Sequence, residues 1–223
     1  GISGYLDNVA APGSLGFTGM WSGGSGQTET SYGLNYGTLD RTGSGAQWGQ
    51  QGGGRNQYNL AAPFDSSTTG TYYISWLQRA SDDTFSGVEF YDGTVSDIDR
   101  KLAATASLGN WSIRVNEGAD VSSGVAFAPN ATVLYVVKLT LSDTPGADTA
   151  SFWVNPSSIG GSEPSGDVTI SGGFDFTTDR IGFAAFGPAN AGFDEFRIGD
   201  TYADVTPTTP GYPGYRAAIA TLS

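Results

Sequence analysis

Carboxylates are the groups in this chain best suited to chemistry, because its sequence contains neither histidine nor cysteine. Without histidine, the commonest general base and metal ligand is missing, which excludes Ser-His-Asp triads and zinc-histidine centres. Without cysteine, disulfides, thiolate metal sites and cysteine nucleophiles are excluded as well. What remains is chemistry done by carboxylates, hydroxyls, amides and aromatic rings.

Asp194 is the carboxylate that the local pattern singles out. If Phe196 and Ile198 face the core, the two-residue period of a strand turns Asp194 inward and Glu195 and Arg197 outward. A buried carboxylate must accept hydrogen bonds or ligate a cation. Calcium takes six to eight oxygen ligands and suits an acidic protein without histidine. We therefore expect Asp194 either to cap backbone N–H groups or to ligate calcium.

Aromatic rings with polar neighbours form the second candidate site. Carbohydrate sites use rings that stack on sugar faces and polar groups that hold the hydroxyls. Trp21 and Trp48 lie in glycine-rich segments that read as loops, where core packing is less expected. Tyr91 and Asp92 end a predicted strand beside a turn, and Arg55 is one of few cations in the amino-terminal half. We predict that these five residues bind ligand; the alternative is that the rings cover the ends of the fold.

Glycan hydrolysis is the enzymatic alternative, since it needs only two carboxylates about 5–9 Å apart. The nearest pairs in the sequence are Glu89 with Asp92 and Asp194 with Glu195. Their spacings send the two side chains to opposite faces of a regular strand. We therefore assign no catalytic residue and expect a binding or assembly protein rather than an enzyme.

The elements that position these residues are strands. Alternating apolar residues predict strands at Gly70–Arg79, Ser86–Asp92, Trp111–Val115, Thr132–Leu141, Thr149–Asn155, Phe174–Phe176, Arg180–Phe186 and Gly192–Gly199. The turn DTPGAD predicts a hairpin between the two strands that flank it. A short strand is also expected in TSYGLNYG (30–37), and the best helical candidate is the brief stretch 100–107. The strand residues Trp76, Trp111 and Trp153 are expected in the core.

Glycine makes up 34 of the 223 residues, and aromatic residues make up 13%. Glycine at this level indicates many tight turns, and a disordered chain would lack the aromatic residues. Strands spaced by glycine turns predict an all-β, antiparallel two-sheet sandwich of the jelly-roll type. We expect one domain over residues 1–207, followed by a Pro/Gly linker and C-terminal tail at 208–223.

The charge of the chain restricts its partners. A formal net charge of −12 and a pI near 4.1 argue against nucleic acid, because phosphate contacts need clustered Lys or Arg. The same charge repels anionic membrane surfaces. No apolar run is long enough to span a membrane, so no membrane insertion is expected. The opening GISGYLDNVAAPG has no basic region and no apolar core, so it is not expected to be a signal peptide.

Several segments resemble a known family. The most specific is IGFAAFGPANAGFDEFRIGDTYADVTP, and GTYYISWLQR, YVVKLTLSDTPGADTASFWVNP and GSLGFTGMWSGGSG precede it. Together they resemble the laminin-G-like, or concanavalin A-like, jelly-roll domain of exported bacterial surface proteins. The resemblance implies the sandwich fold and a secreted, extracellular or cell-surface location. It also implies that the first and last strands are neighbours, which would bring Asp7 to Asp194 as a second calcium ligand.

Our leading hypothesis is therefore a secreted, non-catalytic module that binds glycan or matrix polymer, with calcium as a stabilising ion. The second hypothesis is a structural subunit of an extracellular filament or surface layer. In that case residues 208–223, or the amino-terminal strand, add to the sheet edge of a neighbouring copy. A carbohydrate-active enzyme is the third and least favoured hypothesis.

Overall fold

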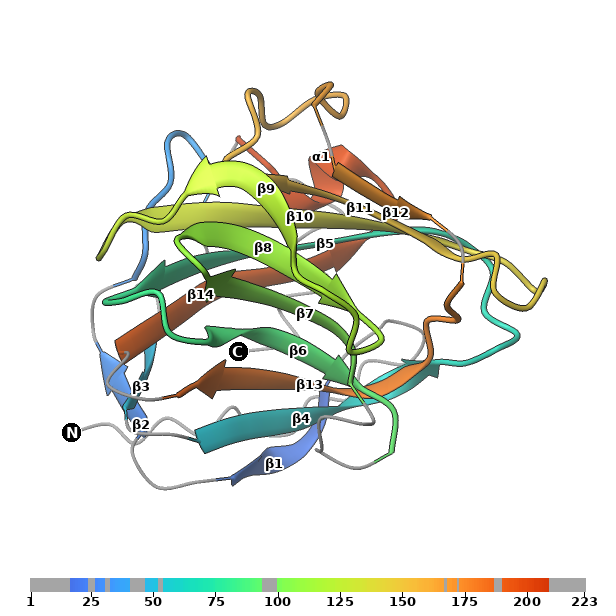
Figure 1. Ribbon diagram of the computed structural model, residues 1–223, viewed down its shortest axis with the longest axis horizontal. Coiled ribbons are helices and arrows are strands. Elements are labelled where there is room, and N and C mark those ends of the chain that lie inside the picture. Colours follow the sequence, from blue (N-terminus) through green and yellow to red (C-terminus); the bar gives the residue numbers. More distant parts are fainter. Residues whose placement is uncertain are drawn as a thin grey trace.

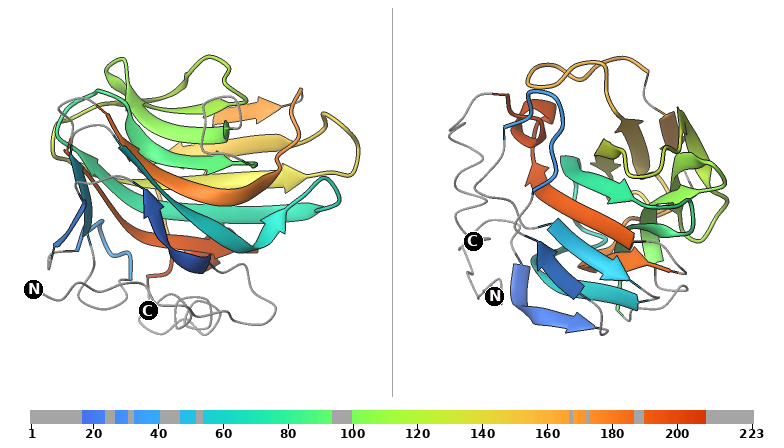
Figure 2. Two further views of the ribbon diagram at one scale, coloured as in Figure 1. Left: turned by 90° about the horizontal axis from the view of Figure 1, so that it is seen from below. Right: turned by 90° about the vertical axis from the view of Figure 1, so that its left-hand side faces the viewer.

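In the part of the chain that the structure describes, two antiparallel sheets of seven strands each stack face to face (Figures 1 and 2). A computed structural model describes residues 17–23, 27–30, 33–40, 47–51, 54–93, 100–166, 168–171, 173–186 and 190–208. For the described residues among 17–30 and 47–58, and for 61, 62 and 171, it describes the backbone alone. The predicted all-β jelly-roll sandwich is confirmed.

Sheet A has the strand order β1-β4-β13-β6-β7-β8-β9. Its strands are β1 (Phe17–Gly23), β4 (Gly54–Phe64), β13 (Thr178–Ala185), β6 (Ser86–Tyr91), β7 (Arg100–Ser107), β8 (Asn110–Val115) and β9 (Val121–Ala126). Sheet B has the order β12-β11-β10-β5-β14-β3-β2. Its strands are β12 (Val168–Ser171), β11 (Thr149–Val154), β10 (Thr132–Leu141), β5 (Gly70–Ala80), β14 (Asn190–Gly199), β3 (Gln47–Gln51) and β2 (Gln27–Thr30).

The segment that carries the family resemblance crosses from one sheet to the other. β13 pairs with β4 and β6 in sheet A, whereas β14 pairs with β5 and β3 in sheet B. Figure 1 shows the orange β13 beside the teal β4, although the two strands are far apart in the sequence. The predicted β10–β11 hairpin is also confirmed, with six paired positions from Tyr135 to Thr140.

The main core lies between the two sheets. Trp76 stacks on Tyr135 with ring centroids 5.0 Å apart, and Trp111 meets the same tyrosine edge to face at 6.0 Å. Both tryptophans are fully buried, as predicted. Offset and edge-to-face contacts of this kind add to the stabilisation that burial of the rings provides.

A second apolar cluster lies on the outer face of sheet B, the face directed away from sheet A. Its buried members are Leu34, Leu39, Tyr73, Leu77, Leu134, Val136, Trp153, Tyr202 and Val205. Two of these come from the short helix α1 (Tyr202–Val205) and two from residues 33–40, which follow an irregular course instead of the strand expected at 30–37. Trp153 is buried as predicted, though in this outer cluster. No helix within the described residues is long enough to cross a membrane.

The stretch 100–107, the best helical candidate, is the strand β7. Its alanines favour helix when considered alone. In the fold, however, Leu102, Ala104 and Ala106 face the main core while β6 and β8 pair with β7 on either side. Packing between two strands therefore overrides the intrinsic preference.

Gly87 is the glycine whose lack of a side chain matters most for this packing. A Cβ placed on Gly87 would lie 1.8 Å from the carbonyl oxygen of Ala104 on β7. We expect Gly87→Ala to lower the free energy of unfolding by about 2–3 kcal/mol or more, because the backbone of β6 must shift. Gly161→Ala is the matched control, since nothing lies within 4 Å of its Cβ position. Equal urea unfolding midpoints for the two variants would contradict this account.

Candidate functional site

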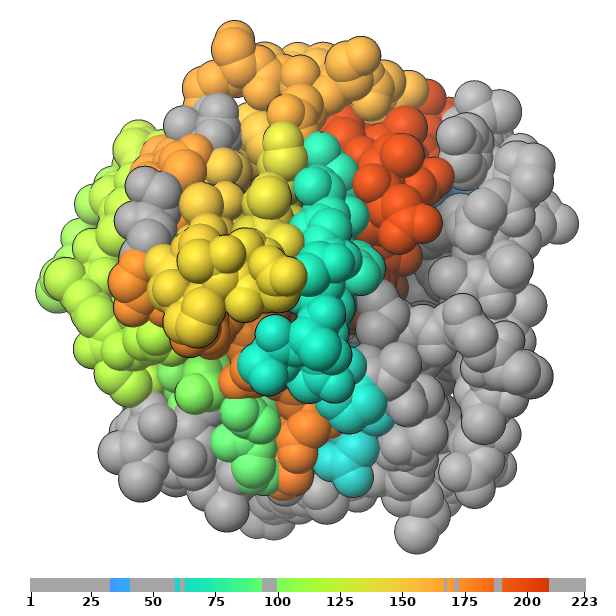
Figure 3. All heavy atoms as spheres, turned by 90° about the vertical axis from the view of Figure 1, so that its right-hand side faces the viewer, coloured from blue at the N-terminus to red at the C-terminus, as the bar shows by residue number. Residues whose placement is uncertain are grey.

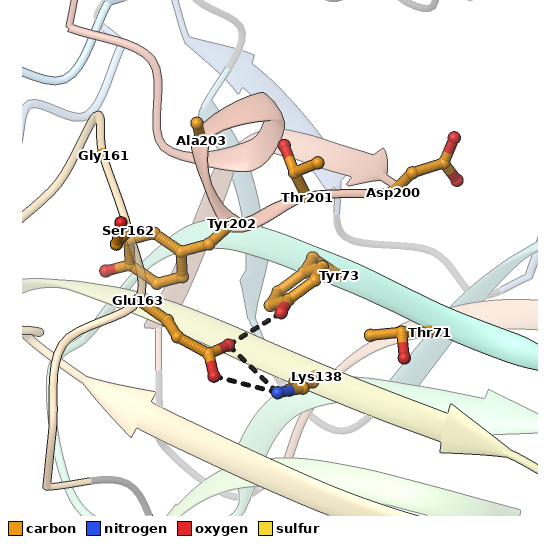
Figure 4. A pocket seen from close by; sticks show the side chains of 10 residues that line it. All are labelled: Thr71, Tyr73, Lys138, Gly161, Ser162, Glu163, Asp200, Thr201, Tyr202 and Ala203. Carbon is orange, nitrogen blue, oxygen red and sulfur yellow. Dashed lines mark hydrogen bonds and ion pairs between the residues drawn. The ribbon is translucent and has the colours of Figure 1, made fainter.

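An open cleft of about 590 Å³ lies on the outer face of sheet B, beside the second cluster. It is lined by Thr71, Tyr73, Lys138, Gly161, Ser162, Glu163, Asp200, Thr201, Tyr202 and Ala203 (Figure 4). Thr71 and Tyr73 are two residues apart on β5, so their side chains project from the same face of the sheet. Lys138 lies directly opposite Tyr73 on β10. In Figure 3 the teal start of β5 lies between the yellow of β10 and the red of the carboxy-terminal segment.

Glu163 contacts a side chain of β5 and a side chain of β10. Its carboxylate accepts a hydrogen bond from the hydroxyl of Tyr73 at 2.7 Å and contacts Nζ of Lys138 at 2.9 and 3.1 Å. Figure 4 shows the Glu163 side chain descending from the loop between β11 and β12 to meet both partners. Nζ of Lys138 also lies 5.8 Å from the centre of the Tyr73 ring. The cleft thus offers an ammonium, a carboxylate and a phenol at one point.

Tyr202 of α1 supports this polar group from the side. Its ring meets Tyr73 edge to face at 6.3 Å and Trp153 at 5.7 Å. Its hydroxyl donates to the carbonyl of Ser158 at 2.7 Å, and Nε1 of Trp153 donates to the carbonyl of Pro164 at 3.1 Å. These two bonds hold the segment that carries Glu163 against the sheet, so the cleft has a supported wall.

The pKa values of three side chains in the cleft, Tyr73, Lys138 and Tyr202, are raised further above neutral pH. Burial, followed by the hydrogen bond and charge of Glu163, raises the pKa of Tyr73. The hydrogen bond to Glu163 raises the pKa of Lys138. Burial also raises the pKa of Tyr202, with smaller contributions from Tyr36 and Glu163. At neutral pH the two phenols are therefore protonated and Lys138 is charged.

Two of the predicted ligand-binding residues lie elsewhere, on sheet A. Tyr91 is fully buried and its hydroxyl donates to Glu89, so its ring is not available to a ligand at the surface. Glu89 also pairs with Arg100 at 2.5 Å, and Arg100 contacts Glu117 through two nitrogens. Tyr91 thus belongs to an ionic network that is buried at Glu89 and Arg100, and not to a sugar platform. This burial could not be read from its position at the end of a strand.

Asp92 is exposed, and its carboxylate accepts a hydrogen bond from the hydroxyl of Thr177 at 2.5 Å. This bond joins the end of β6 to the segment that leads into β13. Asp92 is therefore tied to a neighbouring turn, away from the cleft.

Trp21, Trp48 and Arg55 lie in strands, where loops were expected for the two tryptophans. Trp21 belongs to β1 and Arg55 to β4, both in sheet A, whereas Trp48 belongs to β3 in sheet B. Their side chains lie outside the described part of the structure. The predicted set is therefore divided between two sheets, and its ligand-binding role stays a prediction.

Asp194 faces outward, not inward as the regular strand period predicted. A β-bulge at Glu195, whose φ is 52°, shifts the register of β14 against β5. Phe193 and Phe196 both pack on the main core, and Asp194 lies opposite Leu77 on the outer face. The bulge supplies one extra residue, which reverses the alternation on its amino-terminal side.

The oxygens of Asp194 are engaged by backbone donors. Oδ2 accepts from the N–H of Leu34 at 2.7 Å, and Oδ1 accepts from the N–H of Glu195 at 2.8 Å. This arrangement is the capping alternative to a calcium site. Asp7 lies outside the described residues, and among those described no three His, Cys, Asp or Glu side chains gather as a metal site. Calcium stays a prediction.

Glu195 and Arg197 are buried, although both were expected on an exposed face. They pair with each other at 2.6 Å, and Arg197 donates to the carbonyl of Asp40 at 2.5 Å. Arg197 does face away from the main core, but residues 33–40 cover this part of the sheet. The covering segment, which the sequence pattern did not reveal, explains the difference.

The cleft residues escaped prediction for a definite reason. Alternation places Tyr73 and Lys138 on the face opposite the core, and that much is visible in the sequence. Glu163 lies in the polar loop SSIGGSEPSGD, where no periodic pattern marks one residue above another. Only the fold brings the loop to the strands.

Burial raises the pKa of Asp194 from 3.8 to about 6, with the hydrogen bond from Leu34 opposing the shift. A carboxyl with a raised pKa in the fold stabilises it fully below its ordinary pKa, and this stabilisation is lost as the pH rises through about 6. We expect wild type to lose on the order of 2–3 kcal/mol of unfolding free energy between pH 4 and 6.5 that Asp194→Asn does not lose. Urea unfolding at both pH values, with the exposed Asp143→Asn as control, tests this. An identical pH dependence in all three proteins would contradict it.

Comparison with known proteins supports the fold. No protein-family model and no curated protein matches the chain. Among solved structures, HCR/D-Sa-GBL1/C superposes with a TM-score of 0.50 at 10% identity, covering 83% of this chain and 44% of that one. The chain thus spans less than half the length of that protein.

Two further solved structures show a similar likeness. The botulinum neurotoxin serotype C1 binding domain superposes with a TM-score of 0.49 at 12% identity, covering 90% of this chain and 46% of that one. The alginate lyase AlgAT5 of polysaccharide lyase family 7 superposes with a TM-score of 0.45 at 9% identity, covering 70% of this chain and 77% of that one. At these identities the likeness concerns the jelly-roll fold, and the laminin-G-like assignment stays a prediction from sequence.

Proposed function

We propose that this chain is a secreted, non-catalytic module that binds a glycan or matrix polymer in the cleft on sheet B. The observation that carries the proposal is the meeting of Tyr73, Lys138 and Glu163 in an open space of about 590 Å³. Ligand sites of about 300–1,000 Å³ commonly combine apolar or aromatic walls with a few fixed polar groups. This cleft fits that description.

Sugar hydroxyls both donate and accept hydrogen bonds, and the cleft supplies both partners. Glu163 accepts, the ammonium of Lys138 donates, and the hydroxyl of Thr71 does either. The rings of Tyr73 and Tyr202 are buried beneath these groups and support them from below. Because Glu163 already orients Tyr73 and Lys138 by hydrogen bonds, little ordering remains to be done when a ligand enters.

The protonation states favour binding over catalysis. A general base works best when its pKa lies near the working pH. In this cleft the pKa values of Tyr73 and Lys138 are both raised, so each stays protonated at neutral pH and is unavailable as a general base. The direction of both shifts therefore supports a binding role for these two side chains over one as general base.

The proposal includes an extracellular location and a polysaccharide partner. The acidic composition and the family resemblance support the location, and the jelly-roll fold is one that hosts many binding functions. Assembly into a filament stays a second hypothesis, because nearly all of the tail at 208–223 lies outside the described residues. The stabilising calcium ion likewise has no described site.

Lys138→Met and Tyr73→Phe test the cleft with little change of volume. Lys138→Met removes a polar contact to the ligand, and Tyr73→Phe removes a hydrogen bond that orients Glu163. We therefore expect glycan affinity to fall about 5- to 30-fold, or about 1–2 kcal/mol. The measurement is isothermal titration with glycans that wild type retains on a glycan array. Lys101→Met, on β7 of the other sheet, is the matched control and should bind as wild type does.

Two results would contradict the proposal. One is wild-type protein that retains no glycan on the array, or Lys138→Met protein that binds with unchanged affinity. The other is release of reducing sugar ends by wild type that Glu163→Gln abolishes, which would make the cleft an active site.

A further inference from the structure

The cleft opens onto a row of polar side chains that crosses sheet B. In the register of the sheet, Tyr73 lies opposite Lys138, Lys138 opposite Ser151, and Ser151 opposite Thr169. Residues opposite one another in an antiparallel pair project from the same face. These four residues therefore form one line across β5, β10, β11 and β12, on the outer face of the sheet.

A second polar line runs parallel to the first, two residues further along each strand. Thr71 lies opposite Thr140, and Thr140 lies opposite Thr149. Figure 4 shows Thr71 beside Tyr73 and Lys138 at the floor of the cleft, so this line also begins there. The two lines together, made of Tyr73, Lys138, Ser151, Thr169, Thr71, Thr140 and Thr149, are called the hydroxyl track below.

Apart from Tyr73, which is buried, the hydroxyl track is accessible, in contrast to the covered part of this face. Thr140 and Thr169 are exposed and Thr149 and Ser151 are half-buried, whereas Leu134 and the other apolar residues of the second cluster are covered. The hydroxyls of Ser151 and Thr169 lie 2.7 Å apart, hydrogen-bonded to each other across two strands. The outer face of sheet B is thus divided into a covered apolar part and an open polar part.

The charge of the track identifies the kind of ligand. Lys138 is its single charged side chain, and Glu163 neutralises it at 2.9 Å. Asp200, at the rim of the cleft, adds a negative charge, as does the net charge of −12 of the whole chain. A polyanion would be repelled here, while an uncharged polymer rich in hydroxyls finds donors and acceptors along its length.

We propose that an extended, neutral polysaccharide binds across the strands, with one part in the cleft and the rest along the hydroxyl track. The proposal rests on the function proposed above and specifies its ligand. Three inter-strand steps of about 4.8 Å give the track a length of about 14 Å from β5 to β12. A ligand that occupies the track must therefore extend beyond the cleft, and its affinity must depend on chain length.

The test uses ladders of cello-, xylo-, manno- and malto-oligosaccharides from disaccharide to octasaccharide, titrated calorimetrically against the full chain. We expect one neutral ladder to bind, with affinity rising about tenfold or more with length as track hydrogen bonds are added. Oligogalacturonides serve as the anionic probe and should bind at least about tenfold more weakly than the neutral ladder.

The variant is Thr140→Val combined with Thr169→Val, which removes two track hydroxyls and keeps the shape of both side chains. We expect it to bind short oligosaccharides as wild type does and to lose most of the gain with length. Thr132→Val is the matched control, because Thr132 lies at the other end of β10, beyond the covered cluster. It should retain the full length dependence.

Each outcome has a separate meaning. If no ladder binds, the proposed function fails together with this inference. If a ladder binds without length dependence, or if the double variant keeps the gain in affinity with length, binding in the cleft is retained and binding along the hydroxyl track is refuted. Tighter binding of oligogalacturonides than of every neutral ladder would refute the neutral ligand alone.

Discussion

The pairing of β5 with β10 is the constraint on which the rest of the molecule depends. Ten consecutive positions are in register, from Thr132 opposite Arg79 to Leu141 opposite Gly70. Along this ladder one set of alternate residues, with Trp76 and Tyr135 at its centre, fills the main core. A slip by one residue would turn these rings outward, so burial of the core fixes the register strongly. The same register sets which residues meet on the other face.

The opposite face of this ladder is not uniform, and this difference creates the site. Leu134 and Val136 of β10 need a cover, which α1 and residues 33–40 and 155–164 provide. Lys138 and Thr140 continue the strand beyond that cover. The cleft lies at the boundary, where the covering segments end and the polar end of the ladder begins. Its walls are therefore a consequence of burying the second cluster, and its position follows from the point at which β10 changes from apolar to polar.

The alternation of apolar and polar residues in the sequence predicts the central strands and their buried faces. β5, β10 and β11 were predicted almost to the residue, and so were the buried positions of Trp76, Trp111 and Trp153. The bulge in β14 could not be predicted, because glutamate rarely adopts a positive φ and Glu195 shows no local signal for one. That single residue turned Asp194 to the other face. Tyr91 was misjudged for a related reason: alternation does not show that its hydroxyl donates to Glu89, which in turn pairs with Arg100 of the neighbouring strand.

The charge distribution explains why an acidic protein presents a polar and nearly neutral track. Charged side chains in the described structure are mostly engaged in pairs, as at Arg114 with Asp120 and Arg180 with Asp179, or they cap backbone N–H groups, as at Asp148. Where β10, β11 and β12 extend beyond the covered cluster, the outward positions other than Lys138 are instead threonine and serine. Their hydroxyls cost little to desolvate against another hydroxyl-bearing surface. A net charge of −12 disfavours polyanionic ligands. In the function proposed above, recognition is therefore left to uncharged hydrogen bonds, which discriminate by geometry and gain strength by repetition along the strands.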